Sequence, residues 1–350
     1  MSDQRLRDLG VRIEDATPIP DFDDLVRRAR RRVAMRGAGT VAAAVAASAA
    51  IVFGVLQVGA QMNQTSPMNQ TSPPPAERTV HDRVKWCPMG RSPDCVDLSG
   101  WIVYQHNGIW ALDPSRPDDP DHKIQLTNQR EVDPLEWSSD GTKLLVRSWG
   151  QGGHLSVLHA DGTETLIAEG GFFDGSFSPD GSRVIYTPYA GGGMGIVESE
   201  GGTPRRLLDP TPGDGVYELA YSPDGEQIAY FTGGGDHSHT LRVMSSDGTD
   251  GRTLLFHPEA SHINDLDWSP DGQRLMFSFA QGEGGIWIVG VDGSDPTQVV
   301  PSGVNPAWSP DGTRISYEVG TLRIADADGT HVTEFGYGGS GAWNPLPLDR

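Results

Sequence analysis

A short unit repeats along this chain, and it constrains the fold more than any other feature. In "NPAWSPDGTRISY" (residues 305–317) an aromatic residue precedes Ser-Pro-Asp-Gly, and an alternating apolar run follows. Ser, Pro and Gly stand where a type I turn prefers them, so the unit is predicted to be strand, tight turn and strand. Equivalent turns follow Trp137, Phe177, Tyr221 and Trp268, with Ser139 replacing the proline in the first. The five aromatic residues are 40, 44, 47 and 40 residues apart, close to the period of a four-stranded propeller blade.

Each turn is followed by a second apolar run and a further glycine turn. Examples are "LSVLHADG", "LRVMSSDG" and "IWIVGVDG", which predict a third strand and a turn into a fourth. Four short strands cannot bury both faces of their sheet alone, but blades stacked radially can. The sequence therefore predicts a β-propeller.

The number of blades follows from the two incomplete units at the ends of the repeat. A pair of apolar strands at 100–114 lacks an inner strand, and "GAWNP" at 341–345 is an inner strand without the rest. The simplest closure places both in one blade, with Trp343 beside Ile102. We thus expect an all-β, six-bladed β-propeller.

The segments "YSPDGEQIAYFTGGGDHSHTLRVMSSDG" and "WSPDGQRLMFSFAQGEGGIWIVGVDG" resemble the PD40 (WD-like) repeat of the TolB-like six-bladed propellers. The resemblance covers roughly residues 99 to 345, and the N-terminal region suggests a membrane-anchored actinobacterial type. The resemblance implies the fold. It does not imply one activity, because such propellers host binding, scaffolding and catalysis alike.

The region before the repeats predicts a membrane anchor. Residues 37–60 carry no charge, and as a helix they would span about 36 Å against a hydrocarbon core of about 30 Å. The arginine-rich stretch 27–36 precedes them, which favours a cytoplasmic N-terminus. The expected organisation is a cytoplasmic tail (1–36), a transmembrane helix (37–60), an extracytoplasmic linker (61–86) and the propeller (87–350). A cleaved signal peptide and a buried helix are the alternatives.

The cysteine content and the charge restrict the function further. Cys87 and Cys95 are the only two cysteines, and in an exported segment such a close pair predicts a disulfide. The net charge of −20 argues against nucleic acid as a partner and favours cationic ligands.

Candidate ligand-binding residues emerge when the inner strands are aligned on their aromatic residue. Oxygen-bearing side chains stand three residues or one residue before it, and positions two apart on a strand point the same way. These residues are Glu136, Asp174, Glu218, Asp265, Asp267 and Asn305. Such oxygens suit Ca²⁺, although the same side chains can instead cap strands or link blades. The sequence therefore does not establish a metal, and Ca²⁺ is the one candidate cofactor.

No nucleophile motif, phosphate loop or catalytic domain accompanies the repeats, so binding is favoured over catalysis and no catalytic residue is assigned. We expect a single-pass protein that displays an extracytoplasmic binding or scaffold module for a protein or small ligand. One alternative is a metal-dependent, lactonase-like hydrolase that uses the acidic residues at the channel mouth. Another is a transmembrane regulator whose tail binds a sigma factor.

Overall fold

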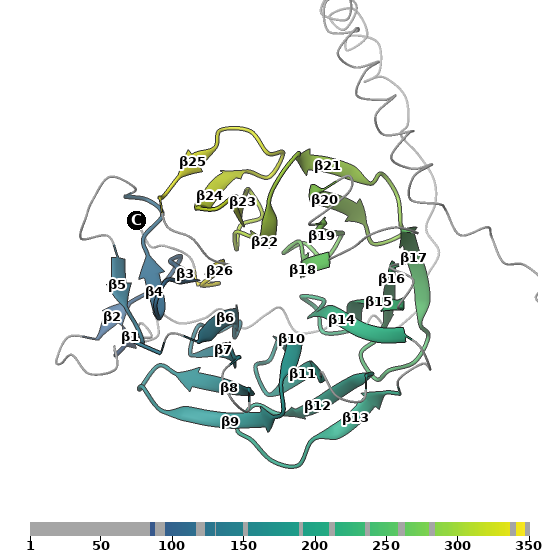
Figure 1. Cartoon of the computed structure of the whole chain (residues 1–350), viewed down its shortest axis with the longest axis horizontal. Helices are drawn as coiled ribbons and strands as arrows, with labels where there is room; N and C mark the ends of the chain where they lie inside the picture. The colour runs from purple at the N-terminus through teal and green to yellow at the C-terminus, as the bar shows by residue number, and fades with distance from the viewer. Residues whose placement is uncertain are drawn as a thin grey trace, which may run out of the picture. The chain divides into compact units, whose positions relative to one another are not determined.

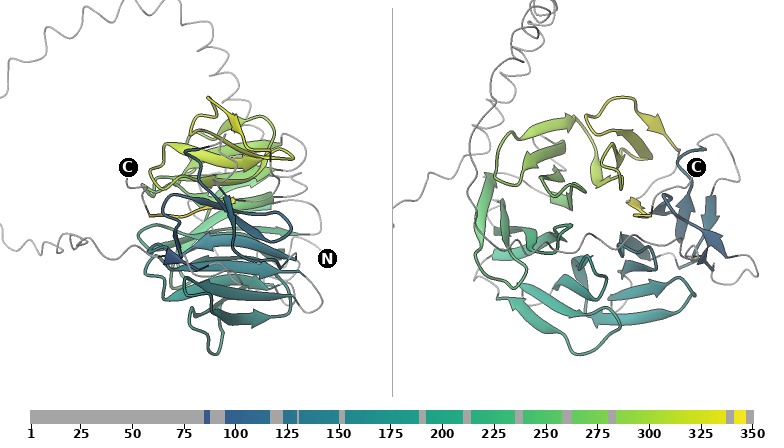
Figure 2. Two further views of the ribbon diagram at one scale, coloured as in Figure 1. Left: turned by 90° about the vertical axis from the view of Figure 1, so that its left-hand side faces the viewer. Right: turned by 180° about the vertical axis from the view of Figure 1, so that it is seen from behind.

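The computed structural model describes residues 85–87, 95–116, 123–129, 131–149, 153–188, 192–209, 214–234, 239–257, 263–279, 284–336 and 341–346. Six four-stranded antiparallel sheets form a ring around a central channel (Figure 1). Seen from the side, the strands run across the thickness of the ring (Figure 2). The predicted all-β, six-bladed architecture is confirmed.

The blades are numbered in ring order, each from its inner strand outwards. Blade 1 consists of β26 (Gly341–Trp343), β3 (Ile102–Gln105), β4 (Ile109–Leu112) and β5 (Lys123–Gln125). Blade 2 consists of β6 (Val132–Trp137), β7 (Lys143–Ser148), β8 (His154–His159) and β9 (Glu164–Glu169). Blade 3 consists of β10 (Phe172–Phe177), β11 (Arg183–Pro188), β12 (Met194–Glu198) and β13 (Arg205–Leu208).

The remaining three blades follow the same order along the chain. Blade 4 consists of β14 (Asp214–Tyr221), β15 (Gln227–Gly234), β16 (His239–Ser245) and β17 (Arg252–His257). Blade 5 consists of β18 (Ile263–Trp268), β19 (Arg274–Phe279), β20 (Gly285–Gly290) and β21 (Thr297–Val300). Blade 6 consists of β22 (Val304–Trp308), β23 (Arg314–Glu318), β24 (Leu322–Asp326) and β25 (Thr333–Glu334).

The ring closes in blade 1, where strands from the two ends of the repeat region pair. β26 runs antiparallel to β3, with Trp343 opposite Ile102 and Gly341 opposite Tyr104. The amide of Asn344 also donates to the carbonyl of Trp101 at 2.8 Å. The predicted closure is confirmed.

The Ser-X-Asp-Gly turns have the geometry that their residues predict. In all five the glycine amide donates to the serine carbonyl at 2.7 to 2.9 Å, and each glycine has a φ between +66° and +73°. In blade 3 the hydroxyl of Ser178 donates to Asp180 Oδ1 at 2.6 Å, and that oxygen accepts the amide of Ser182. These hydrogen bonds lower the pKa of Asp180 to about 2. Serine and aspartate are therefore required by the turn itself.

The hydrophobic core is divided among the seams between blades. Six clusters of buried side chains occur, one at each seam. The side chains of neighbouring residues in one strand pack into different seams: Leu144 packs between blades 1 and 2, whereas Leu145 packs between blades 2 and 3. Both faces of the second strands are thus buried, so a residue between two alternating apolar positions is buried as well, as Ser316 is between Ile315 and Tyr317.

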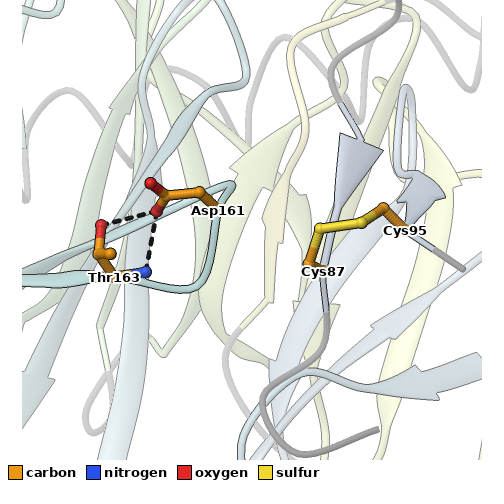
Figure 3. The surroundings of a disulfide bond; sticks show 4 residues. All are labelled: Cys87, Cys95, Asp161 and Thr163. Atoms are coloured by element: carbon orange, nitrogen blue, oxygen red, sulfur yellow. Dashed lines mark hydrogen bonds between the residues drawn. A yellow bond between two sulfur atoms is a disulfide. The ribbon is translucent and has the colours of Figure 1, made fainter. Parts of the chain in front are cut away.

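A short hairpin precedes blade 1. It consists of β1 (Lys85–Trp86) and β2 (Val96–Asp97), and a disulfide between Cys87 and Cys95 joins its strands (Figure 3). The predicted disulfide is confirmed, and we call this hairpin the clip. The sequence did not predict that the clip contacts blade 2 as well as blade 1. The amide of Cys87 donates to the carbonyl of Ala160 in blade 2 at 3.1 Å.

Within the ranges given above, the structure contains no helix that is long and apolar enough to span a membrane. The tail (1–36), the anchor (37–60) and nearly all of the linker (61–86) lie outside the described residues.

Candidate functional site at the central channel

The inner strands of the six blades surround a cavity of about 910 Å³. Its lining includes Asn107 and Trp149, which lie in loops after second strands, and Pro179, Pro223 and Pro345, which lie on the face of the Ser-X-Asp-Gly turns. The cavity therefore reaches from one face of the ring towards the other.

A β-bulge in each inner strand of blades 2 to 6 shapes the wall of this cavity. The register between first and second strands shifts near the position three residues before the aromatic residue. Glu218, Asp265 and Asn305 occupy this position with φ values of 24°, 46° and 55°. The bulge interrupts the alternation of side chains, so the simple rule that positions two apart point the same way does not hold there.

The structure places five of the six candidate residues at the cavity wall. These are Glu136, Asp174, Asp265, Asp267 and Asn305. Glu218 does not belong to the lining: its carboxyl group interacts with the side chain of Asp174 and with the backbone amide of Asp265. Glu218 thus lies between its neighbours instead of facing the open channel.

Three of these carboxylates bind backbone amides of the next blade. Glu136 Oε2 accepts the amide of Phe177 at 2.7 Å, and Asp267 Oδ2 accepts the amide of Trp308 at 2.8 Å. In the same way Asp174 Oδ2 accepts the amide of Leu219 at 2.8 Å. The inner edge of an innermost strand has no neighbouring strand, so these side chains supply the acceptors that its amides need.

Burial among other acids raises the pKa values of this group. Burial is the main cause for Glu136, whose pKa rises to about 8, and the charges of Asp267 and Asp174 add to it. Burial likewise raises the pKa of Asp265 and of Asp267 to about 7. The pKa of Glu218 is raised well above its usual range by burial and by the charges of Asp174 and Asp265. Several of these groups therefore change protonation near neutral pH.

Three charged residues that sequence reasoning missed also line the cavity. Arg147 Nη2 lies 3.1 Å from Asp133 Oδ2, and Glu318 Oε2 accepts a hydrogen bond from Asn305 Nδ2 at 3.2 Å. Arg147 and Glu318 stand near or at the ends of second strands, next to the loops. An alignment of second strands would have shown them, whereas the alignment of inner strands did not.

Trp149 is a further feature of the cavity mouth that the sequence alone did not single out. Its side chain is 60% exposed, although Trp is usually well covered in a folded domain. Arg147 lies over its ring, with 5.6 Å between the guanidinium carbon and the ring centroid. A large aromatic surface is therefore held at the rim beside the charged wall.

The charge of the lining is strongly unequal. Six carboxylic residues line the cavity, namely Asp133, Glu136, Asp174, Asp265, Asp267 and Glu318, and Arg147 is the single Lys or Arg among the lining residues. Across the described part of the chain, no three His, Cys, Asp or Glu side chains are grouped so that they could hold a metal ion. The geometry offers an acid-rich recess with an aromatic rim, and the raised pKa values of its acids make its charge depend on pH near neutrality.

Comparison with known proteins supports the fold. Neither protein-family models nor curated proteins gave a match to this sequence. A putative TolB from Agrobacterium tumefaciens has a similar structure, with a TM-score of 0.55, 24% identity, and coverage of 70% of this chain and 92% of that chain. TolB from Acinetobacter baumannii has a TM-score of 0.57 and 18% identity, with coverage of 71% of this chain and 68% of that chain.

A third similar structure comes from a nidogen/laminin complex, with a TM-score of 0.54, 11% identity, and coverage of 65% of this chain and 89% of that chain. Identities this low show a shared fold and nothing about activity. The described ring is a six-bladed propeller of TolB-like fold.

Proposed function

We propose that this protein is a membrane-anchored, extracytoplasmic binding propeller whose channel mouth receives a basic segment of a partner protein. The observation that carries the proposal is the cavity of about 910 Å³ with Trp149 60% exposed at its rim. Exposed aromatic residues beside a recess contribute much of the energy in protein interfaces. A well-formed recess into which several polar groups converge is also the default site at which to expect a ligand.

The charge of the lining supports a cationic partner. The cavity has six carboxylic residues against one arginine, and the whole chain has a net charge of −20. A Lys or Arg side chain entering the mouth would meet acidic acceptors beside Trp149, whose ring already has the guanidinium of Arg147 over it. The similar fold found in a nidogen/laminin complex is in keeping with a role in protein recognition.

A library of random peptides displayed on phage and panned against the full chain in mild detergent tests this proposal. We expect enrichment of peptides with Lys or Arg, and loss of their binding in Trp149→Ala and Glu318→Gln. The matched control is Leu166→Ala, because Leu166 is 51% exposed but lies on outer strand β9. Peptides that bind all variants equally, or an absence of enriched basic peptides, would contradict a basic partner at the mouth.

The location is proposed from the N-terminal sequence. The uncharged stretch 37–60 follows an arginine-rich segment, and this order favours a cytoplasmic N-terminus. Alkaline phosphatase fused after residue 60 should be active in cells, whereas the same enzyme fused after residue 36 should not. Equal activity of both fusions would refute the topology.

The proposal includes no bound cofactor. Adding calcium chloride to the full chain should leave its melting temperature unchanged, because a cation that binds only the folded ring would raise it. A rise that disappears in Asp265→Asn would instead indicate a calcium site at the channel wall.

A further inference from the structure

Both ends of the described chain meet at one turn of blade 2. The indole Nε1 of Trp86, in the clip, donates to the carbonyl of Gly141 at 2.9 Å. A Cβ atom at Gly141 would also lie 2.9 Å from Leu346 and 3.2 Å from Asn344 Oδ1. Gly141 therefore contacts residues that lie before the first blade strand and after the last one.

The clip is also coupled to the strand that closes the ring. The rings of Trp86 and Trp137 pack edge to face, with 4.7 Å between their centroids. The indole of Trp137 in turn donates to the carbonyl of Ala342, in the middle of β26, at 3.3 Å. A path of direct contacts thus leads from the clip through two tryptophans to the closing strand.

The closing strand is short, so each contact that it makes outside its own sheet matters: Trp343 Nε1 donates to Ser316 Oγ at 2.9 Å, and the guanidinium of Arg314 lies 5.2 Å from the centroid of the Trp343 ring. β26 has three residues and pairs on one edge with β3, which is far from it in sequence. The strands of the clip have only two residues each, and hairpins of this size are unstable alone. Trp86 is nevertheless 5% exposed and Leu98 is fully buried, both in the seam between blades 1 and 2.

We propose that the Cys87–Cys95 disulfide is a redox-sensitive latch on the ring. Oxidised, it fixes the clip so that Trp86 supports Trp137 and Gly141, and through them β26. A dithiol reductant opens it by exchange: one thiolate attacks a cysteine sulfur, the S–S bond breaks, and the second thiol releases the reductant as its own disulfide. Two electrons and two protons pass to the cysteines, which become thiols. Both cysteines are partly exposed, so a reductant can reach them.

Hydrogen exchange of the full chain, with and without dithiothreitol, tests the latch. After reduction we expect exchange at residues 341–346 and 101–105 to become at least about tenfold faster, because this closing pair opens locally. Strands β18 and β19 of blade 5 are the internal control and should keep their protection. Alkylation of Cys87 and Cys95, read by mass spectrometry, shows that reduction has occurred.

Two variants separate the latch from general loss of stability. Cys87→Ser with Cys95→Ser should show the fast exchange without reductant and no further change when it is added. Trp86→Phe keeps the disulfide but removes the hydrogen bond to Gly141, and it should accelerate exchange at 341–346 in the oxidised protein. Unchanged exchange at 341–346 in fully alkylated protein overturns the proposal, and so does equal acceleration in all six blades.

Discussion

Glu136 offers the sharpest test of how the channel acids affect stability. Its carboxylate accepts the amide of Phe177 at 2.7 Å, and burial raises its pKa from 4.5 to about 8. The variant Glu136→Gln keeps an oxygen acceptor for that amide and removes the charge. The variant Glu136→Ala removes both, so the two substitutions separate the hydrogen bond from the ionisation.

The sign of the pH effect follows from linkage. A raised pKa means that the folded ring holds the proton more tightly than the unfolded chain, so the contribution to stability is complete below pH 4.5 and is lost as pH rises towards about 8. One pKa unit corresponds to about 1.4 kcal/mol, which sets a ceiling near 5 kcal/mol for this shift. Glu136 is only half-buried and faces the cavity, so we expect water there to reduce the effect to about 1 to 2 kcal/mol.

Urea unfolding of the full chain, followed by tryptophan fluorescence at pH 5 and pH 8, measures the effect. Relative to the wild type, Glu136→Gln should change little at pH 5 and should be more stable by about 1 to 2 kcal/mol at pH 8. Glu136→Ala should be less stable by about 1 to 3 kcal/mol at pH 5, because the Phe177 amide loses its acceptor. The control Glu169→Gln, exposed on β9, should have little effect. If Glu136→Gln differs from the wild type equally at both pH values, the assignment of a raised pKa is refuted.

Two further predictions compare matched positions of the repeat, and a third concerns the pH dependence of stability. Gly141→Ala and Gly272→Ala impose the same backbone strain, since φ is +67° and +69°, but only the new methyl group at position 141 would approach Leu346 and Asn344. Gly141→Ala should therefore have the lower melting temperature. Equal melting temperatures would contradict the contact with Leu346. Trp268→Phe loses the hydrogen bond from Nε1 to the carbonyl of Ala220, whereas Trp308 Nε1 has no hydrogen-bond partner within the described residues. In urea unfolding, Trp268→Phe should therefore be about 1 kcal/mol less stable than Trp308→Phe. The reverse order would count against this hydrogen bond. The lowered pKa of Asp180, about 2, adds stability that is lost as pH falls from 3.8 towards 2, and the raised pKa values of the channel acids remove stability as pH rises towards 8. Melting scans should therefore show a maximum between about pH 4 and 6, and a maximum above pH 8 would contradict the raised pKa values of the channel acids.

The repeat and the closure were predictable from sequence because their signals are local. Ser309, Pro310 and Gly312 each fit one place of a turn, and the alternation of Ile315 and Tyr317 marks the strand that follows. The missing inner strand at 100–114 and the lone strand at 341–345 then left one simple way to complete the sixth blade. The pair Cys87 and Cys95 was equally readable, because it is close in sequence and is the only pair available.

The channel was less predictable because its contacts join different blades. Alignment of inner strands found Glu136 and Asp267, but it could not show that their carboxylates bind the amides of Phe177 and Trp308 in the following blades. It placed Glu218 with the others, although a bulge sets this residue between Asp174 and Asp265. Arg147 and Trp149 lie outside the inner strands, so an alignment of inner strands alone did not include them.

By itself the sequence determined the blade, its strand order, the number of blades and the site of closure, since hydrophobic periodicity and turn chemistry act over a few residues. Only the tertiary structure decided which acids line the channel and which accept backbone amides of the next blade. It also decided that residues from both ends of the described chain lie against Gly141. These outcomes depend on side chains that are about forty or more residues apart and become neighbours when the ring closes, as Trp86 and Gly141 do. Burial in that closed ring then raises the pKa values of the channel acids, and no local pattern carries this information.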